Sequence, residues 1–182
     1  MSLKSKLLLI CTLLSLPIFA DQNDEALDIH FQTLQQSTDR EEIQRAERRI
    51  WMKWMDHDDY AVARLMTIAA ERMNYQRYPE AMLVYNQLIQ NYPDYAEAWN
   101  KRATLNYLLG NLDESIADVE KTLQLEPRHF GALSGLGLIY IQRKEFAKAK
   151  QAFEDLIEVH PSSPNAQQNL QLVNEEIRLG VI

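Results

Sequence analysis

Three glycines lie close together in the stretch LEPRHFGALSGLG, residues 125–137: Gly131, Gly135 and Gly137. Glycine-rich loops bind phosphate when they lie between a strand and the N-terminus of a helix, because free backbone N–H groups then point at the anion. The glycines therefore raise the question of phosphate or nucleotide chemistry. The elements before and after them decide whether this interpretation holds.

A second candidate for chemistry is the acidic stretch MDHDDY, with Asp56, His57, Asp58 and Asp59. Its oxygens could hold a hard cation, but a calcium loop needs more ligands at fixed spacing and a glycine at its turn. An exposed turn between two helices is therefore the favoured interpretation.

The histidines are scattered along the chain, and no two of them have the spacing of metal ligands. No sequence order of serine, histidine and aspartate indicates a hydrolase triad. The sequence therefore predicts no metal, no cofactor and no catalytic residue, and favours a protein that is not an enzyme. The histidines are His30, His57, His129 and His160.

The stretch RRIWMKW combines Arg48, Arg49 and Lys53 with Trp51 and Trp54, and could form a basic and aromatic patch for nucleic acid or a membrane surface. The two tryptophans are one helical turn apart, which favours core packing beside a solvated basic face. The net charge of −7 also argues against nucleic acid, whose binding depends on Lys and Arg neutralising phosphates.

The N-terminus has the order of a secretory signal peptide: Lys4 and Lys6, an apolar run over 7–19, and Ala20 before a polar stretch. The run is shorter than the roughly 20 residues that span a bilayer, so a retained anchor is the weaker alternative. We expect residues 1–20 to be removed after Ala20, which gives a periplasmic or secreted protein that meets a membrane only through this transient segment. The mature chain would carry 17 basic and 26 acidic residues, a net charge of −9, and no cysteine.

An internal period of 34 residues organises the rest of the chain, in rows 62–95, 96–129 and 130–163 without any insertion. Apolar residues recur at three- and four-residue spacings, which predicts two amphipathic helices in each row. Small residues let paired helices approach, and prolines stop the second helix of each row. The aligned positions are Leu65/Trp99/Leu133, Ala69/Ala103/Gly137, Tyr78/Leu112/Phe146, Ala81/Ser115/Ala149, Tyr85/Val119/Phe153 and Pro93/Pro127/Pro161.

This pattern resembles the tetratricopeptide repeat (TPR), and the third row fits it best, at Leu133, Leu136, Gly137, Tyr140, Ala149, Phe153 and Pro161. The resemblance implies an all-α, right-handed solenoid of antiparallel helix pairs. It places the three glycines inside the first helix of the third pair, with no strand before them, so a phosphate loop is disfavoured. The stretches IWMKWM and 96–137 also resemble a group of exported proteobacterial TPR proteins, and the organisation is similar to that of envelope adaptors.

The flanking segments fit this solenoid less closely. Residues 21–61 are predicted to form a degenerate leading hairpin, since Phe31, Leu34, Trp51 and Trp54 match repeat positions while Glu47 occupies the place of a small residue. Residues 164–182 are predicted to form a capping helix with one apolar face, which a repeat array requires at its end.

The resemblance further implies that the first helices of the pairs line a concave groove that binds a peptide or a partner helix. We therefore expect an exported protein–protein interaction adaptor, with a self-associating envelope protein as the alternative. Chaperone-binding members of the family use Lys, Asn and Arg at positions where this chain has Met66, Ala70, Gly131 and Gly135, which argues against that activity. The predicted groove residues, among which Asn100, Tyr107 and Gln142 would give polar specificity, are Met66, Ala70, Met73, Asn74, Asn100, Thr104, Tyr107, Leu108, Ser134, Leu138, Ile141 and Gln142.

Overall fold

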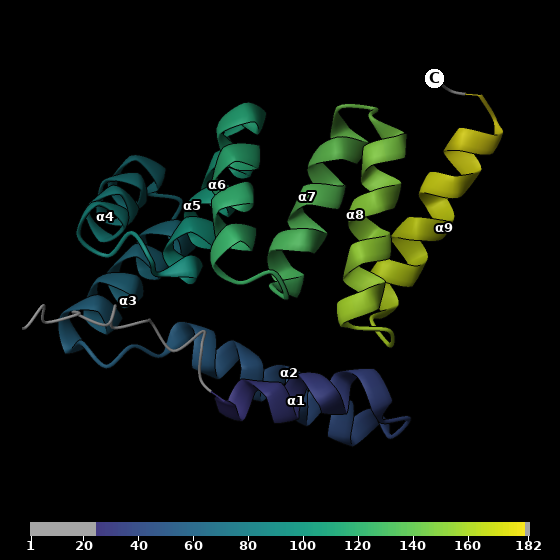
Figure 1. Ribbon diagram of the computed structural model, residues 1–182. Coiled ribbons are helices and arrows are strands. Elements are labelled where there is room, and N and C mark those ends of the chain that lie inside the picture. The colour runs from purple at the N-terminus through teal and green to yellow at the C-terminus, as the bar shows by residue number, and fades with distance from the viewer. Residues whose placement is uncertain (1–24, 181–182) are drawn as a thin grey trace, which may run out of the picture.

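The computed structural model describes residues 25–180, so the predicted signal peptide, residues 1–20, lies outside the described residues. The described residues form nine α-helices and no strand, and the helices succeed one another as an array of antiparallel pairs (Figure 1). The all-α solenoid predicted from the sequence is therefore confirmed. Its helices are α1 (Glu25–Gln36), α2 (Arg40–Met55), α3 (Tyr60–Asn74), α4 (Tyr78–Asn91), α5 (Ala96–Leu109), α6 (Leu112–Leu125), α7 (Phe130–Gln142), α8 (Phe146–Val159) and α9 (Pro164–Arg178).

The three repeats correspond to the pairs α3/α4, α5/α6 and α7/α8, and α9 packs against α8 as a final helix. Each second helix ends two residues before the proline of its row, because a proline ring disfavours the helical conformation in the residue before it. The turns between the repeats are therefore 92–95, 126–129 and 160–163, which we call the turn edge.

Small residues bring the two helices of a pair together. In α5/α6, the Ser115 hydroxyl donates a 2.7 Å hydrogen bond to the carbonyl oxygen of Ala103. In α7/α8, a Cβ at Gly137 would lie only 2.6 Å from Cε1 of Phe153, whose side chain is fully buried. Side chains larger than those present would force the paired helices apart.

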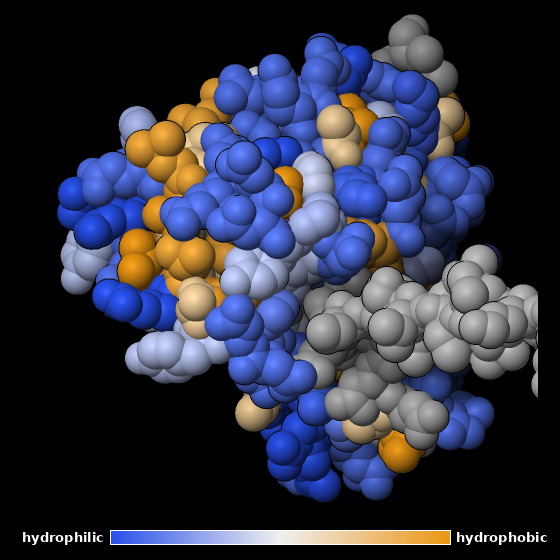
Figure 2. All heavy atoms as spheres, turned by 60° about the vertical axis from the view of Figure 1, so that its left-hand side comes forward, coloured by the Kyte–Doolittle hydropathy of each residue, from blue (hydrophilic) through white to orange (hydrophobic). Residues whose placement is uncertain are grey.

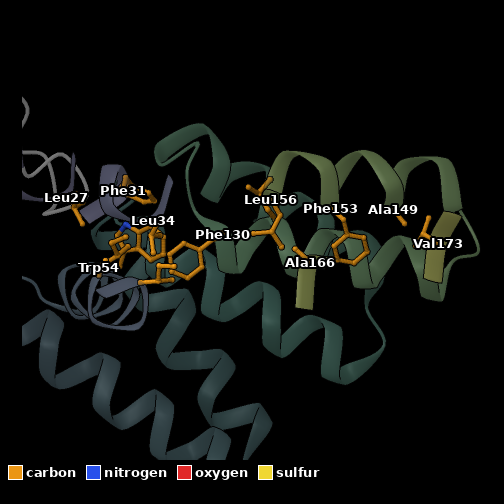
Figure 3. Packing of buried hydrophobic residues seen from close by; sticks show 14 of the residues in the cluster. Leu27, Phe31, Leu34, Trp54, Phe130, Ala149, Phe153, Leu156, Ala166 and Val173 are labelled. Atoms are coloured by element: carbon orange, nitrogen blue, oxygen red, sulfur yellow. The ribbon is translucent and has the colours of Figure 1, made fainter. Parts of the chain in front are cut away.

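The N-terminal hairpin, α1 and α2, departs from its expected place. Instead of stacking in front of α3/α4 as a leading repeat, it crosses the turn edge and packs against α5, α7 and α8 (Figure 1). Leu27, Phe31 and Leu34 gather with Trp54 beside Phe130 of α7 (Figure 3). The hairpin and the last three helices therefore share one hydrophobic core.

Local sequence accounts for the start of two flanking helices. The Asp39 side chain accepts hydrogen bonds from the backbone N–H groups of Glu41 and Glu42 at the start of α2. At the start of α9, Ser163 accepts from the N–H of Ala166, and Pro164 occupies the first turn.

Hydrophilic side chains cover most of the face shown in Figure 2, with apolar side chains gathered toward one side. None of the helices formed by residues 25–180 has the length and apolar character needed to cross a bilayer.

Candidate partner-binding site

The first helices of the second and third repeats, α5 and α7, enclose a pocket of about 320 Å³. We call it the groove pocket. It brings together six of the residues predicted from the sequence: Asn100, Thr104, Tyr107, Leu108, Ser134 and Leu138. The remaining lining residues are Ala103, Ser115, Val119, Gly131, Ala132, Gly135 and Ile139.

Two of the predicted residues on α3 differ from their expected role. Met66 is only 2% exposed and packs in the core of the first repeat, so it does not reach the groove surface. The Met73 sulfur accepts a 3.3 Å hydrogen bond from the buried Tyr85 hydroxyl. Both side chains point into α3/α4 because the helix turns its apolar face to its partner helix.

The other predicted residues lie outside the groove pocket. Ala70 and Asn74 are on α3, away from the lining residues, and Asn74 is exposed. Ile141 packs partly against the core shared with the hairpin, and Gln142 is exposed at the end of α7. The structure therefore narrows the predicted site to the space between α5 and α7.

The two glycines that line the groove pocket have different surroundings. A Cβ at Gly131 would lie 2.6 Å from Cη2 of Trp51, so the hairpin already fills that space. A Cβ at Gly135, one turn further along α7, would meet no atom of another element among residues 25–180 within 4 Å. The missing side chain of Gly135 is therefore part of the open volume.

A buried polar cluster lies at the end of the groove pocket that faces the hairpin. His129 Nδ1 accepts the backbone N–H of Ala132, so its Nε2–H donates to Glu97 Oε2 at 2.9 Å. Asn100 Nδ2 donates to the same oxygen at 2.9 Å, and Lys101 Nζ lies 3.0 Å from Glu97 Oε1. Oε2 of this almost completely buried carboxylate thus takes two hydrogen bonds, and the Lys101 ammonium places an opposite charge beside Oε1.

Burial is the largest single influence on Glu97, and alone it would raise the pKa of that carboxyl. The hydrogen bond and electrostatic attraction of His129, together with the Lys101 ammonium, outweigh burial and hold the pKa of Glu97 below its usual value. Glu97 is therefore an ionised structural group at neutral pH.

The N-terminal hairpin borders this cluster through aromatic contacts. The Trp54 ring stacks on the His129 ring, with centroids 4.0 Å apart and planes inclined by 10°. Trp51 meets Phe130 edge-on at 5.2 Å, and Lys101 Nζ lies 5.4 Å from the centroid of Trp51. The hairpin therefore forms a fixed wall at one end of the groove pocket.

The same hairpin contacts all three turns of the turn edge. The Tyr95 hydroxyl donates to the carbonyl oxygen of Trp54 at 3.1 Å, and Arg128 pairs with Asp28 at 2.6 Å. In the last turn, His160 Nε2 lies 3.9 Å from a carboxylate oxygen of Glu47. Sequence reasoning missed this interface, although a signal existed: Tyr95 and His129 occupy the same position of successive repeats, where a solvated turn needs no ring.

The glycine-rich and acidic stretches, which the sequence raised as alternative sites, form parts of the helices and their caps. The glycine-rich stretch after residue 129 lies in the helix α7. In the acidic stretch, Asp59 caps α3 by accepting from the Ala61 N–H at 2.8 Å, and it also accepts from the Tyr92 hydroxyl. That hydroxyl, ahead of the Ala61 N–H, lowers the pKa of Asp59. Within residues 25–180, no three His, Cys, Asp or Glu side chains are grouped as a metal site would require.

The basic and aromatic stretch divides between core and surface. Trp54 is 2% exposed and Trp51 is half-buried, as core packing predicts, whereas Arg48 and Arg49 face solvent. The stretch therefore presents no aromatic platform on which a base could stack.

Comparisons with known proteins agree with this architecture. Two family models described as tetratricopeptide repeat match residues 66–124 and 106–172. A TPR repeat-containing protein of Rhizobium etli is 33% identical over 153 residues, which are 84% of this chain and 75% of that protein. Hsp70-Hsp90 organizing protein 1 of Glycine max is 26% identical over 129 residues, and the match covers 69% of this chain but only 23% of that protein.

Solved structures share the fold. The first TPR of Spaghetti (RPAP3), bound to the HSP90 peptide SRMEEVD, superposes with a TM-score of 0.62 at 18% sequence identity. The match covers 64% of this chain and 93% of that one. At this identity the similarity shows the arrangement of helices and nothing about the ligand.

Proposed function

Because the chain belongs to the tetratricopeptide repeat family, we propose that it is a non-enzymatic adaptor that binds a segment of another protein in the groove pocket. The observation that carries this proposal is the pocket between α5 and α7 that residues 25–180 leave open, bordered by the exposed side chains of Leu108 and Leu138. Apolar surface beside a few neutral polar groups is the usual composition of a site that holds a peptide side chain.

A TPR domain of similar fold has been solved with a bound HSP90 peptide, which shows that this arrangement of helices can hold a peptide segment. The N-terminal hairpin restricts where such a segment can lie, since Trp51 fills the space next to Gly131. A bound segment therefore contacts the part of the groove that runs from Asn100 toward Leu108 and Leu138.

Site-specific photo-crosslinking tests this assignment in the cell. Tyr107→p-benzoylphenylalanine places the reactive group in the groove pocket, and Ala117→p-benzoylphenylalanine places it on an exposed position of α6 as the control. We expect a crosslinked partner at position 107 and not at 117. A partner captured only at position 117 would refute the groove assignment.

We also propose that the protein acts in the periplasm or outside the cell, after removal of residues 1–20. The supporting observation is the order of basic, apolar and small residues in the sequence. Mass measurement of the chain purified from the envelope fraction tests this. The mass of a chain that begins at Asp21 would support removal of the segment, and the mass of a chain that still contains residues 1–20 would contradict it.

Self-association is the second candidate. Ile157 and Leu170 line a shallow hollow between α8 and α9, and Leu172 of α9 is 46% exposed. An end helix with apolar surface could be covered by a second copy of the chain. Light scattering at two concentrations distinguishes the candidates, since an adaptor keeps the monomer mass at both and a self-associating protein does not.

A further inference from the structure

We propose that the groove pocket takes an uncharged apolar side chain of the bound segment, such as leucine, methionine or phenylalanine, and excludes a carboxylate. This inference rests on the proposed function and specifies the chemistry of the partner at that site. It follows from the volume of the pocket, its charge and the state of the nearby cations.

On the α7 side of the pocket, no side chain projects from Gly135. Apart from the backbone of α7 itself, no atom of the described residues lies within 4 Å of the position that a Cβ would take there, and the exposed Leu108 and Leu138 also line the pocket. A side chain from the bound segment can enter this space and contact apolar atoms of both helices. Its removal from water is the driving force for binding.

Charge complementarity favours an uncharged occupant, because none of the residues that line the pocket is charged. A carboxylate placed there would lose its hydration without gaining an opposite charge, which is strongly unfavourable. An apolar side chain has no comparable hydration energy to lose when it enters the pocket.

The cations nearest to the pocket on α5 are already engaged. Lys101 pairs with Glu97 at 3.0 Å, at the end closed by the hairpin. Arg102 binds Asp118 through two bonds of 2.6 and 2.9 Å and donates to Asn86 at 2.8 Å. The charge of each cation is therefore already balanced by a carboxylate of the fold, so a bound carboxylate would gain little from either.

Neutral polar groups at the rim can orient the backbone of the segment. Asn100 uses its Nδ2 group on Glu97, which directs the amide and leaves Oδ1 as an acceptor for a backbone N–H. Tyr107 and Ser134, which carry hydroxyl groups, also line the pocket. These groups recognise a peptide backbone without selecting for charge.

Selection from a phage library of random dodecapeptides tests the inference with the chain purified after expression with its own leader. We expect the selected peptides to share one leucine, methionine or phenylalanine. Replacing that residue by aspartate should weaken binding by about tenfold or more, because it puts a charge into an apolar space. This comparison uses the unaltered protein, so it does not depend on how any variant folds.

A pair of protein variants locates the anchor. Gly135→Leu fills the pocket and should weaken the same peptides by about tenfold or more, whereas Ala117→Leu adds the same side chain on the exposed face of α6 and should leave affinity unchanged. Melting curves of both variants verify that they fold.

The outcomes separate this inference from the proposed function. Peptides that require an aspartate or glutamate and are weakened by Gly135→Leu would overturn the inference and support the groove as the binding site. Selected peptides whose affinity is unchanged by both Gly135→Leu and Tyr107→Ala would overturn the proposed function and the inference with it. Failure to select any peptide would count against both in the same way.

Discussion

The three glycines of α7 face three different regions of the molecule. Gly131 lies against Trp51 of the N-terminal hairpin, Gly137 lies against Phe153 of the partner helix, and Gly135 faces open space in the groove pocket. One residue type within one helix thus serves docking of the hairpin, close pairing of two helices and formation of a pocket. Which of these three roles a glycine has depends on the residue that lies where its side chain would be.

The same contrast holds between the turn edge and the groove pocket. At the turn edge, the hairpin covers polar side chains, and His129 and its partner Glu97, at the start of α5, are both buried. In the groove pocket, a short distance along α5 and α7, Leu108 and Leu138 stay exposed. Apolar residues exposed next to buried charged ones invert the usual distribution, which is typical of a surface kept for a partner.

The largest effect is expected from Trp54→Ala, which removes the ring that joins the hairpin to the turn edge. Trp54 is 2% exposed and stacks on His129, so its loss leaves a cavity and should cost about 3–5 kcal/mol of unfolding free energy. Urea denaturation measures this. Met52→Ala on the same helix, at a side chain 60% exposed, is the control and should change stability by less than about 0.5 kcal/mol. Equal effects would mean that the hairpin does not dock as described.

Gly137→Ala tests the contact within a helix pair. Its Cβ would overlap the fully buried ring of Phe153, and moving that ring would disturb the core around it, so we expect a loss of about 1–3 kcal/mol. Differential scanning calorimetry measures the change. An unchanged melting temperature would show that α7 and α8 are not in close contact at this point.

Gly131→Ala and Gly135→Ala form a matched pair on one helix. Gly135→Ala, in the interior of α7, gains about 1 kcal/mol of helix propensity, whereas Gly131→Ala, in its first turn, gains less and meets Trp51. Gly135→Ala should therefore raise stability by about 1 kcal/mol, and Gly131→Ala should lie below it by about 1–3 kcal/mol because of the overlap. Chemical denaturation of the two variants side by side gives the difference. Equal unfolding free energies for the two variants would contradict the description of the groove as filled by Trp51 at Gly131 and open at Gly135.

Glu97→Gln keeps the shape of the side chain and removes its charge, so it tests how the stability of the fold depends on pH. Because the pKa of Glu97 is lowered by folding, its carboxylate stabilises the fold above the pKa of the unfolded chain. That contribution is lost as pH falls through the folded-state pKa. The variant should therefore lose less stability than the parent between about pH 7 and about pH 3, a range that includes the ordinary glutamate pKa. Melting temperatures at both pH values test this, and parallel losses would contradict it.

Much of the solenoid could be predicted because its signals are local. The small residues Ser115 and Gly137 and the prolines at the row ends act within about one repeat, so their spacing is visible in the sequence. Six of the groove residues followed from the same repeat positions. The prediction that Met66 and Met73 line the groove was wrong, because both side chains point toward the core. A repeat position gives the face of a helix only approximately.

The place of the N-terminal hairpin could not be predicted in this way. Its contacts join residues far apart in sequence, as with Trp54 and His129, Asp28 and Arg128, or Gln35 and the carbonyl of Glu158. Each partner alone is an ordinary polar or aromatic residue, and no periodicity links the two. Glu47, at the position of a small residue, indicated only that the hairpin is unlike the repeats.

The sequence by itself determined the helical repeats, their boundaries to within a few residues and the helices that face the groove, because hydrophobic period and helix-stopping residues are local properties. The tertiary structure alone decided which part of that groove is open. Burial of Trp51 and Trp54 stabilises the chain most where Phe130 and His129 can cover them, so the hairpin docks at the turn edge. The pocket beside Gly135 is the part of the groove that this docking leaves uncovered.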